Sequence, residues 1–341
     1  MSSVIAVDAM GGDYAPGVAV LGALKAVAEI RDVSILLVGR QDEIEAELAK
    51  ANSTKSLKEG SDGSFAAGAI SILHAPDVIG PDEIPTTAIR RKKGSSIVVG
   101  LRAVKEGQAA AFVSAGSTGA LLTGATVVIG RAEGIERPAL GAMLPHRSGF
   151  TFLIDCGANV DCKPIYLDQF AKMGSDYMRH VRGIERPKVG LINIGTEQEK
   201  GNTLVKEAYT LMERSAAAGE FNFVGNVEAR DVPNGAVDVA VCDAFVGNVI
   251  LKYTEGLAKG LMGMVKDELM ADPVSKIGAL ISKGAFNRLK KRLDYDEIGG
   301  APFLGLKNLV VKAHGSSNAK AICGAIRQCT LYNTQNQRPS G

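Results

Sequence analysis

The chain begins with a turn whose residue types suit the binding of an anion. In VDAMGGDYAP, Val7 to Pro16, two aspartates surround a pair of glycines directly after an apolar run. A strand that ends in such a turn exposes backbone N–H groups and leads into a helix, and Pro16 fits the first turn of that helix because its missing N–H is not needed there. Backbone N–H groups of glycine turns and helix N-termini bind anions. We therefore predict that Gly11 and Gly12 contribute to an anion cradle.

Further polar, glycine-containing turns follow apolar runs along the chain. They are SAGSTGA, DCGAN, NIGTE, CDAFVGN and AHGSSN, at residues 114–120, 155–159, 193–197, 242–248 and 313–318. In open α/β sheets, ligands bind beyond the carboxyl ends of the strands. We expect all of these turns to meet at one edge of the sheet and to share one crevice.

Short apolar runs alternate with helical patterns through most of the sequence. Runs such as SVIAVDA, VSILLVG and NLVVKAH are apolar almost throughout, which is typical of strands covered on both faces. The alternation predicts an α/β fold with a doubly wound, mostly parallel sheet. In this interpretation, residues 1–332 form one domain, the polar residues 52–64 form a surface loop, and residues 333–341 form a disordered tail.

One segment, about residues 248–293, breaks the alternation. Its apolar residues recur at helical spacing, at Leu257, Leu261, Met264 and Val265. The pair Asp272-Pro273 then interrupts the helix, because a residue before proline avoids helical geometry. We predict two long helices that form a hairpin projecting from the sheet.

The composition argues against several classes of function. The 341 residues carry a net charge of +2, which is too small to indicate nucleic acid as the main partner. No apolar run reaches the ~18 residues that span a bilayer, so we expect a protein that is soluble or lies on a membrane surface. The odd number of cysteines, without a CxxC pair or a secretory signal, fits a reducing cytosol and inert packing residues. No His or Cys spacing supports a metal site, and we expect no cofactor.

Several motifs follow one another in fixed order between about Ile5 and Ile326. They are AVDAMGGDYAPG, IRRKKGSSI, VSAGSTGALL, LIDCGANVDC, NIGTE, GNVEARD, CDAFVGNVILK, GGAPFLGLK and AHGSS. Together they closely resemble the bacterial phosphate acyltransferase family known as PlsX. The chain departs from the family pattern at three positions: Ser117 stands where Asn is usual, and Ala229 and Ala244 stand where Gly is common.

The resemblance implies a fold like those of the isocitrate and isopropylmalate dehydrogenases and the phosphotransacetylases. It implies an enzyme that converts acyl-[acyl-carrier protein] and inorganic phosphate into acyl phosphate and free carrier protein. The acyl phosphate would supply a membrane glycerol-3-phosphate acyltransferase at the start of phospholipid synthesis. The resemblance also implies a homodimer that is cytoplasmic and peripherally associated with the inner face of the cell membrane.

The implied chemistry agrees with the lack of a Ser-His-Asp or Cys-His signature. Phosphate is already a nucleophile at neutral pH, and a leaving thiol with a pKa of roughly 8.5 needs no strong acid. The site must instead hold the anion in line with the thioester carbonyl and stabilise the tetrahedral oxyanion. Candidate phosphate- and substrate-binding residues are Asp8, Gly11, Gly12, Asp13, Ser114, Gly116, Ser117, Thr118, Gly119, Asn193, Thr196, Asn248 and Ser316.

Three side chains are candidates for a direct catalytic role. His314 could protonate the departing thiolate or bind phosphate, and a structural role is the alternative. Asn159 could donate to the oxyanion or form its turn, and Lys163 is a candidate cation beside it. Carboxylates repel phosphate, so we expect Asp8 and Asp13 to fix their loop or orient a cation, with an Asx-turn or helix cap as the alternative.

Two dense basic runs remain to be explained. They are Arg90, Arg91, Lys92 and Lys93, and Lys290, Lys291 and Arg292. A basic run of this kind can dock the acidic acyl-carrier protein, or it can be an ordinary solvated helix face. In the hairpin, the basic residues can also bind an anionic membrane together with Ile277, Leu280 and Ile281.

Two other functions fit the same residues. A phosphotransacylase that acts on acyl-CoA needs the same anion cradle, and a non-catalytic scaffold on the membrane surface would need only the hairpin. A dehydrogenase is disfavoured, because DAMGGD lacks the GxGxxG spacing of a dinucleotide-binding turn.

Overall fold

The computed structural model describes residues 3–53, 69–293 and 299–336. The first half of the chain forms β1 (Ser3–Asp8), α1 (Gly17–Glu29), β2 (Val33–Gly39), α2 (Gln41–Ser53), β3 (Ile70–His74), α3 (Pro85–Arg91), α4 (Ser96–Lys105), β4 (Ala111–Ser114), α5 (Thr118–Val128), β5 (Ala139–His146), β6 (Gly149–Ile154) and α6 (Pro164–Arg182). The second half forms β7 (Lys188–Asn193), α7 (Thr203–Ala217), β8 (Asn222–Glu228), a 3-10 helix (Ala229–Asn234), β9 (Val239–Val241), α8 (Ala244–Leu269), α9 (Pro273–Leu293), β10 (Ala301–Leu304), β11 (Leu309–Lys312) and α10 (Ala319–Asn336).

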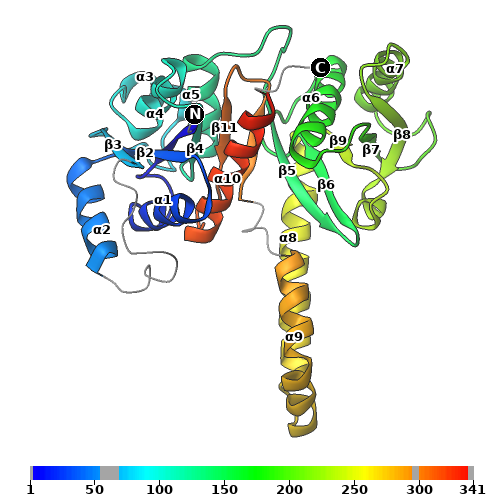
Figure 1. The fold of residues 1–341 in the computed structure, drawn as a ribbon. Helices are drawn as coiled ribbons and strands as arrows, with labels where there is room; N and C mark the ends of the chain where they lie inside the picture. Colours follow the sequence, from blue (N-terminus) through cyan, green and yellow to red (C-terminus); the bar gives the residue numbers. More distant parts are fainter. Residues whose placement is uncertain (1–2, 54–68, 294–298, 337–341) are drawn as a thin grey trace.

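The strands form one sheet in the order β3-β2-β1-β4-β11-β10-β5-β6-β9-β7-β8 (Figure 1). The five strands from β3 to β11 are parallel. Strand β10 is antiparallel to both β11 and β5, and β5 is antiparallel to β6. Consequently β6, β9, β7 and β8, which are parallel to one another, point opposite to β1. The sheet is mostly parallel, as predicted, but its direction changes near the middle.

Helices cover both faces of the first half of the sheet. Successive strand residues point to opposite faces, and on β1 the side chain of Ala6 packs in one apolar cluster, whereas Ile5 and Val7 pack in another. The first cluster includes residues of α4 and α5, and the second includes residues of α1 and α10. This two-sided burial explains why the strands are apolar almost throughout.

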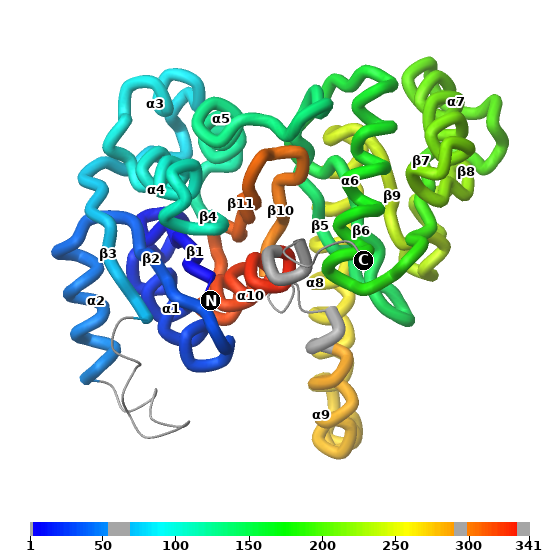
Figure 2. Tube along the Cα trace, turned by 45° about the horizontal axis from the view of Figure 1, so that its top comes forward, coloured from blue at the N-terminus to red at the C-terminus, as the bar shows by residue number. Residues whose placement is uncertain are grey.

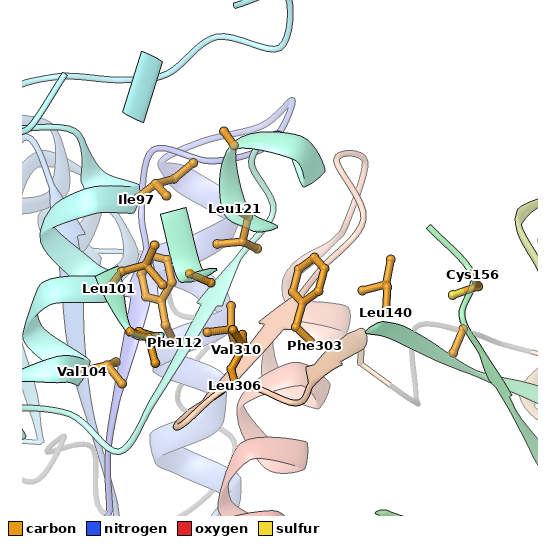
Figure 3. Packing of buried hydrophobic residues seen from close by; sticks show 14 of the residues in the cluster. Ile97, Leu101, Val104, Phe112, Leu121, Leu140, Cys156, Phe303, Leu306 and Val310 are labelled. Atoms are coloured by element: carbon orange, nitrogen blue, oxygen red, sulfur yellow. The ribbon is translucent and has the colours of Figure 1, made fainter. Parts of the chain in front are cut away.

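An apolar cluster continues from the first half of the sheet into the second. It includes Phe112 of β4 and Leu121 of α5, then Phe303 of β10, and finally Leu140 and Cys156 beside β5 and β6 (Figure 3). All five of these side chains are buried. The antiparallel strands at the change of direction therefore lie within a shared core.

The predicted helical hairpin is confirmed. Helices α8 and α9 lie side by side and project from the sheet (Figures 1 and 2). Asp272 begins α9 by accepting hydrogen bonds from the N–H groups of Val274 and Ser275, at 2.8 and 3.0 Å. Helix α8 starts at Ala244, before the predicted position 248. Among the described helices, none combines the length and apolarity needed to cross a bilayer.

Two predicted irregular segments overlap helices. Helix α2 continues to Ser53, and α10 continues to Asn336. The first residues of both segments, 52–64 and 333–341, are thus helical. Residues 54–64 and 337–341 lie outside the described part of the chain.

Candidate active site

Three of the predicted turns meet in what we call the first corner. It consists of the loops after β1, β4 and β11, at residues 8–13, 114–118 and 312–317. The N–H of Asp13 donates to the carbonyl oxygen of Gly315 at 2.8 Å, and the N–H of Ala313 donates to that of Ser114 at 2.9 Å. These loops belong to β1, β4 and β11, which are neighbours in the sheet. The first corner thus joins residues that are about 300 positions apart in the sequence.

Glycine is required at the centre of this corner. Gly12 has a φ of +95°, and a Cβ there would lie 3.0 Å from both the Ala115 Cβ and the Gly315 carbonyl oxygen. A Cβ on Gly11 would lie 2.5 Å from the Asp8 carboxylate. Larger residues would therefore push the three loops apart. The two glycines keep the loop backbones close enough to act on one ligand.

Asp8 organises the first corner from within. Its carboxylate accepts hydrogen bonds from the Ser114 hydroxyl at 2.6 Å and from the N–H of Met10 at 3.1 Å. The Ser114 hydroxyl in turn accepts the N–H of Gly116 at 3.0 Å. Burial raises the pKa of Asp8, and hydrogen bonds from Ser114, Ser96 and the backbone oppose this shift. The structure therefore favours the loop-fixing role for Asp8. The Ser114 hydroxyl donates its hydrogen to this carboxylate.

Lys312 is the cation of this corner, and the sequence reasoning missed it. It is the last residue of β11 and is half-buried. Its Nζ donates to the carbonyl oxygens of Ala115, at 3.4 Å, and of Ala313. Burial and repulsion by Lys252 lower its pKa to about 8, while Asp8 and Asp13 oppose the shift. The available signal in the sequence was a single charged residue, Lys312, directly after the apolar run LVV within NLVVKAH.

His314 lies at the rim of the first corner and is exposed. Its Nδ1 faces the Ser316 N–H at 3.2 Å and the Ser316 hydroxyl at 2.9 Å. A ring nitrogen that accepts an N–H carries no proton, so the proton of the neutral ring is on Nε2. Burial, together with Lys252, lowers the pKa of His314. A neutral imidazole can donate a hydrogen bond from Nε2, but it is a poor source of a proton at neutral pH.

The turns after β6 and β9 meet in what we call the second corner, residues 155–162 and 243–248. Here the carboxylate of Asp155 is fully buried and accepts N–H groups from its own loop and from β5. These donors are the backbone N–H groups of Leu140, Gly157, Ala158 and Asn159 and the Asn159 side-chain amide, at 2.7–3.1 Å. Burial raises the pKa of Asp155, and these N–H donors oppose the shift.

The side-chain amide of Asn159 donates both of its hydrogens to other groups of the protein. Its Nδ2 donates to the Pro138 carbonyl oxygen at 2.8 Å and to Asp155 at 2.7 Å. These contacts use both hydrogens of the amide, so the structure favours the turn-forming role over an oxyanion donor. Lys163 is exposed at the start of α6, with its Nζ 6.0 Å from the centre of the Tyr166 ring.

The cysteines of the chain are free thiols. Cys162 donates to the Asn159 carbonyl oxygen at 3.4 Å, and burial raises its pKa to about 12. Burial likewise raises the pKa of Cys156 and Cys242. Thiols that stay protonated are poor nucleophiles, in agreement with packing roles. In the described ranges, no three His, Cys, Asp or Glu side chains gather as metal ligands.

The turn after β7 lies apart from both corners in its hydrogen bonding. Asn193 is buried, and its side chain binds the Lys200 carbonyl oxygen and the Ile194 N–H within its own loop, at 3.1 and 2.8 Å. Thr196 lines a pocket of about 480 Å³ beside the edge strand β8, together with Asn226. The structure therefore does not bring Asn193 and Thr196 to the first corner.

The hydrogen bonds group the turns into two corners that belong to strands of opposite direction, and Lys252 is close enough to influence the pKa of residues in both. The carboxyl ends of β1, β4 and β11 face one way, and those of β6 and β9 face the other. Helix α8 links the corners: Gly247 in its first turn packs so closely that a Cβ would lie 1.9 Å from the Asp155 carbonyl oxygen. Farther along the same helix, Lys252 is close enough to His314 and Lys312 to lower the pKa of both.

The remaining candidates lie at the starts of helices. The Ser117 hydroxyl caps α5 through the Ala120 N–H at 3.5 Å, and Thr118 and Gly119 form the first turn. Asn248 is exposed in the first turns of α8. A Cβ on Gly119 would lie 2.8 Å from Pro85. A substitution of Gly119 would therefore disturb the contact with α3 before it affected an anion.

The two basic runs are far apart. Arg90, Arg91 and Lys93 are exposed at the end of α3, and Lys92 donates to Glu83 and to the Val78 carbonyl oxygen, both at 2.8 Å. Residues 290–292 belong to the end of α9, and their side chains lie outside the described part of the structure. Because α3 and the hairpin lie on opposite sides of the molecule (Figure 1), the runs do not form one surface.

The fold is similar to that of phosphotransacetylases. A phosphotransacetylase from Streptococcus pyogenes superimposes with a TM-score of 0.61 at 17% sequence identity, covering 98% of this chain and 95% of that one. A 4-hydroxythreonine-4-phosphate dehydrogenase from Burkholderia phymatum superimposes with a TM-score of 0.52 at 15% identity, covering 97% and 98%. These similarities confirm the predicted fold class, a mostly parallel α/β sheet shared by phosphotransacetylases and certain dehydrogenases.

The sequence identifies the family more narrowly. The family model described as "Fatty acid synthesis protein" matches residues 3–337. A "Phosphate acyltransferase" from Clostridium botulinum (strain Loch Maree / Type A3) is 49% identical over 328 residues, which cover 96% of this chain and 93% of that protein. The chain therefore belongs to the fatty acid synthesis protein family, the PlsX family, and is an acyltransferase. The resemblance indicated by its motifs is confirmed.

Proposed function

We propose that the enzyme transfers an acyl group from acyl-[acyl-carrier protein] to inorganic phosphate, giving acyl phosphate and holo-[acyl-carrier protein] for membrane phospholipid synthesis. The phosphate oxygen attacks the thioester carbonyl, the C–S bond breaks, and the carrier thiolate takes up a proton. The proposal rests chiefly on the first corner, where three glycine loops surround a half-buried cation, Lys312. Helix α8 brings a second cation, Lys252, close enough to lower the pKa of Lys312, while its Nζ pairs with Glu255 at 2.9 Å.

The chain's own groups can meet the demands of this reaction. The phosphate is a charged nucleophile that needs positioning and compensation of charge, and lysines together with the backbone N–H groups of glycine turns can provide both. His314 with its proton on Nε2 is a candidate donor to a phosphate or carbonyl oxygen. We assign no proton-transfer step to Asn159, whose amide hydrogens are both donated, one to the Pro138 carbonyl oxygen and one to Asp155.

The direct test mixes the purified protein with acyl-carrier thioester and inorganic phosphate. Acyl phosphate is trapped with hydroxylamine, and the released thiol is measured in parallel. We expect equal amounts of both products, with saturation by phosphate. Thiol release without acyl phosphate would indicate hydrolysis and would contradict the proposal.

A phosphotransacylase that uses acyl-CoA is the second candidate, because the solved structures of similar fold include phosphotransacetylases. The same assay with acyl-CoA in place of the carrier thioester distinguishes the two. A clear preference for the carrier thioester supports our proposal. A scaffold without catalysis would give no phosphate-dependent thiol release with either substrate.

We further propose that two chains form a homodimer through the hairpin. Apolar side chains on α8 remain 40–68% exposed in the single chain even with α9 packed beside it, at Val249, Tyr253, Leu257, Leu261, Met264 and Val265. A stripe of this kind is typical of a helix that packs against a partner. Light scattering should show a dimer for the native chain and a monomer for Leu257→Glu combined with Leu261→Glu. A dimer that survives these changes would assign the interface to another surface.

We also propose that the first turns of α9 contact the inner face of the cell membrane, where the membrane glycerol-3-phosphate acyltransferase would receive the product. Val274, Ile277, Leu280 and Ile281 are 62–80% exposed. Apolar groups beside basic residues bind anionic lipid surfaces. Co-sedimentation with anionic vesicles should fall after Ile277→Ser with Ile281→Ser, and the exposed Leu331→Ser change on α10 is the control. Equal pelleting of all variants would favour a solvated hairpin.

A further inference from the structure

The strongest unexplained feature of the molecule is the half-buried ammonium of Lys312. It ends a strand whose other residues, Leu309 to Val311, are buried and apolar. Its Nζ donates to the carbonyl oxygens of Ala115 and Ala313, which belong to two different loops of the first corner. An ammonium has three hydrogens, so these two contacts leave one donor for another acceptor.

The charges around Lys312 come from four elements. Asp8 at the end of β1 and Asp13 before α1 attract its charge, whereas Lys252 of α8 repels it, and His314 follows it in the next loop. The carboxylate of Asp8 is occupied by Ser114 and the Met10 N–H. Within the described part of the chain, Lys312 forms no ion pair with a carboxylate.

A cation that is removed from water without a paired anion is costly. The cost is recovered when an anion binds to Lys312. Lys252 adds a weaker attraction, because its ammonium is already paired with Glu255 at 2.9 Å. Two lysines and three glycine loops therefore suit a compact, doubly charged anion better than a single carboxylate.

We propose that Lys312 binds inorganic phosphate through its free N–H and that its protonation sets the upper pH limit of phosphate binding. This inference rests on the proposed function, since it names the residue that holds the phosphate consumed in the acyl transfer. Lys312 keeps its proton below about pH 8 and loses it above, because burial and Lys252 disfavour the charged form. Phosphate gains negative charge, and does not lose it, as the pH rises, so a loss of affinity would come from the protein.

The test compares Lys312→Met and Lys312→Arg with Lys307→Met as a matched control. Lys307 is exposed on the same β10–β11 hairpin, at the end away from the first corner. Phosphate binding is measured as the rise of the thermal unfolding midpoint with added inorganic phosphate, which needs no turnover. The KM for phosphate and kcat are measured separately with the acyl-carrier thioester.

We expect Lys312→Met to raise the KM for phosphate about 10- to 100-fold, which is the range for loss of a hydrogen bond to a charged group. The phosphate-dependent rise in unfolding midpoint should disappear. In the native chain, phosphate affinity should fall between pH 7.5 and pH 9.5, whereas Lys312→Arg, which stays charged, should bind phosphate with little change over that range. The Lys307→Met variant should behave like the native chain.

Three results would overturn the inference. The first is an unchanged KM for phosphate in Lys312→Met, and the second is a native affinity that is flat from pH 7.5 to 9.5. The third is an equal loss of affinity in Lys307→Met. If Lys312→Met does not fold, the native pH dependence and the Lys312→Arg variant decide the question. Failure of the proposed function is a different result: the native protein would form no acyl phosphate at any pH.

Discussion

The two corners of the sheet are each built around a buried aspartate, and they differ in their charge. In each, a buried aspartate at a strand end holds a glycine turn by accepting N–H groups: Asp8 after β1 and Asp155 after β6. Around Asp155, the acceptors are filled by its own loop, by Leu140 and by Asn159. Around Asp8, the loop also surrounds Lys312, whose ammonium is held near the carboxylate.

This difference separates two uses of one structural motif. A carboxylate whose acceptors are filled by N–H groups fixes a loop and adds stability. A carboxylate beside a half-buried cation also controls how easily that cation keeps its proton. The second corner therefore acts mainly as the platform from which α8 starts, whereas the first corner has the charge to hold an anion.

The largest effect on stability should come from the second corner. Replacing Asp155 with Ala leaves several buried N–H donors without an acceptor, and it should lower the free energy of unfolding by about 3–5 kcal/mol. Asp8→Ala removes fewer contacts and should cost less. Urea unfolding followed by circular dichroism measures both, and an equal cost would contradict the assigned difference.

An effect on pH dependence should appear only in the first corner. The negative charge of Asp8 raises the pKa of Lys312, so Asp8→Asn should lower that pKa. Phosphate affinity should then begin to fall at a lower pH than in the native chain. Asp155→Asn is the matched change and should leave the pH limit in place, as measured by the phosphate-dependent unfolding midpoint. A shift of similar size in Asp155→Asn would remove the distinction between the corners.

Replacing Lys252 of α8 should shift the pH limit of phosphate binding in the opposite direction to Asp8→Asn. Lys252 lowers the pKa of both Lys312 and His314, so Lys252→Met should raise both and move the pH limit of phosphate binding upward. At pH 7 the same variant should bind phosphate more weakly, because one attracting charge is lost. Lys266→Met, an exposed position farther along α8, is the control. An unchanged pH limit in Lys252→Met would separate α8 from the first corner.

The smallest effects should come from the helix caps of the two corners. Asp243 caps α8 through the Val246 N–H at 2.9 Å, and Ser117 caps α5 through a longer contact of 3.5 Å. Asp243→Ala should cost about 1 kcal/mol of unfolding free energy, and Ser117→Ala should cost about 0.5 kcal/mol, the lower end of the range for a cap replaced by alanine. Urea unfolding again measures both, and a larger loss in Ser117→Ala would show that its hydroxyl has a further role in the first corner.

Much of the fold could be predicted because it is encoded locally. Apolar runs of strand length, helical spacing and the Asp272-Pro273 break identify the sheet and the hairpin. The glycine turns also identify loops of both corners. These features depend on residues near one another in the chain, as do the motifs that gave the family. Even Ser117, which departs from the family pattern, is an acceptable helix cap.

Roles of individual side chains depended on distant partners. Asn159 is a plausible oxyanion donor until Pro138 and Asp155 take both of its amide hydrogens. Lys312 is unremarkable in the sequence, and it becomes a candidate only when loops from Asp8 and Ala115 close around it. Burial of this kind is set by contacts across hundreds of residues, which local patterns do not record.

The sequence by itself determined the family, the alternation of strands and helices, and the glycine turns at strand ends. Only the tertiary structure decided how those turns are grouped. The antiparallel pairings of β10 and β5 reverse the second half of the sheet, so that β6 and β9 run opposite to β1 and β4. Strand direction is a property of pairing between distant segments, so the two corners, and the cation Lys312 among the loops of the first corner, emerge only when the chain is folded.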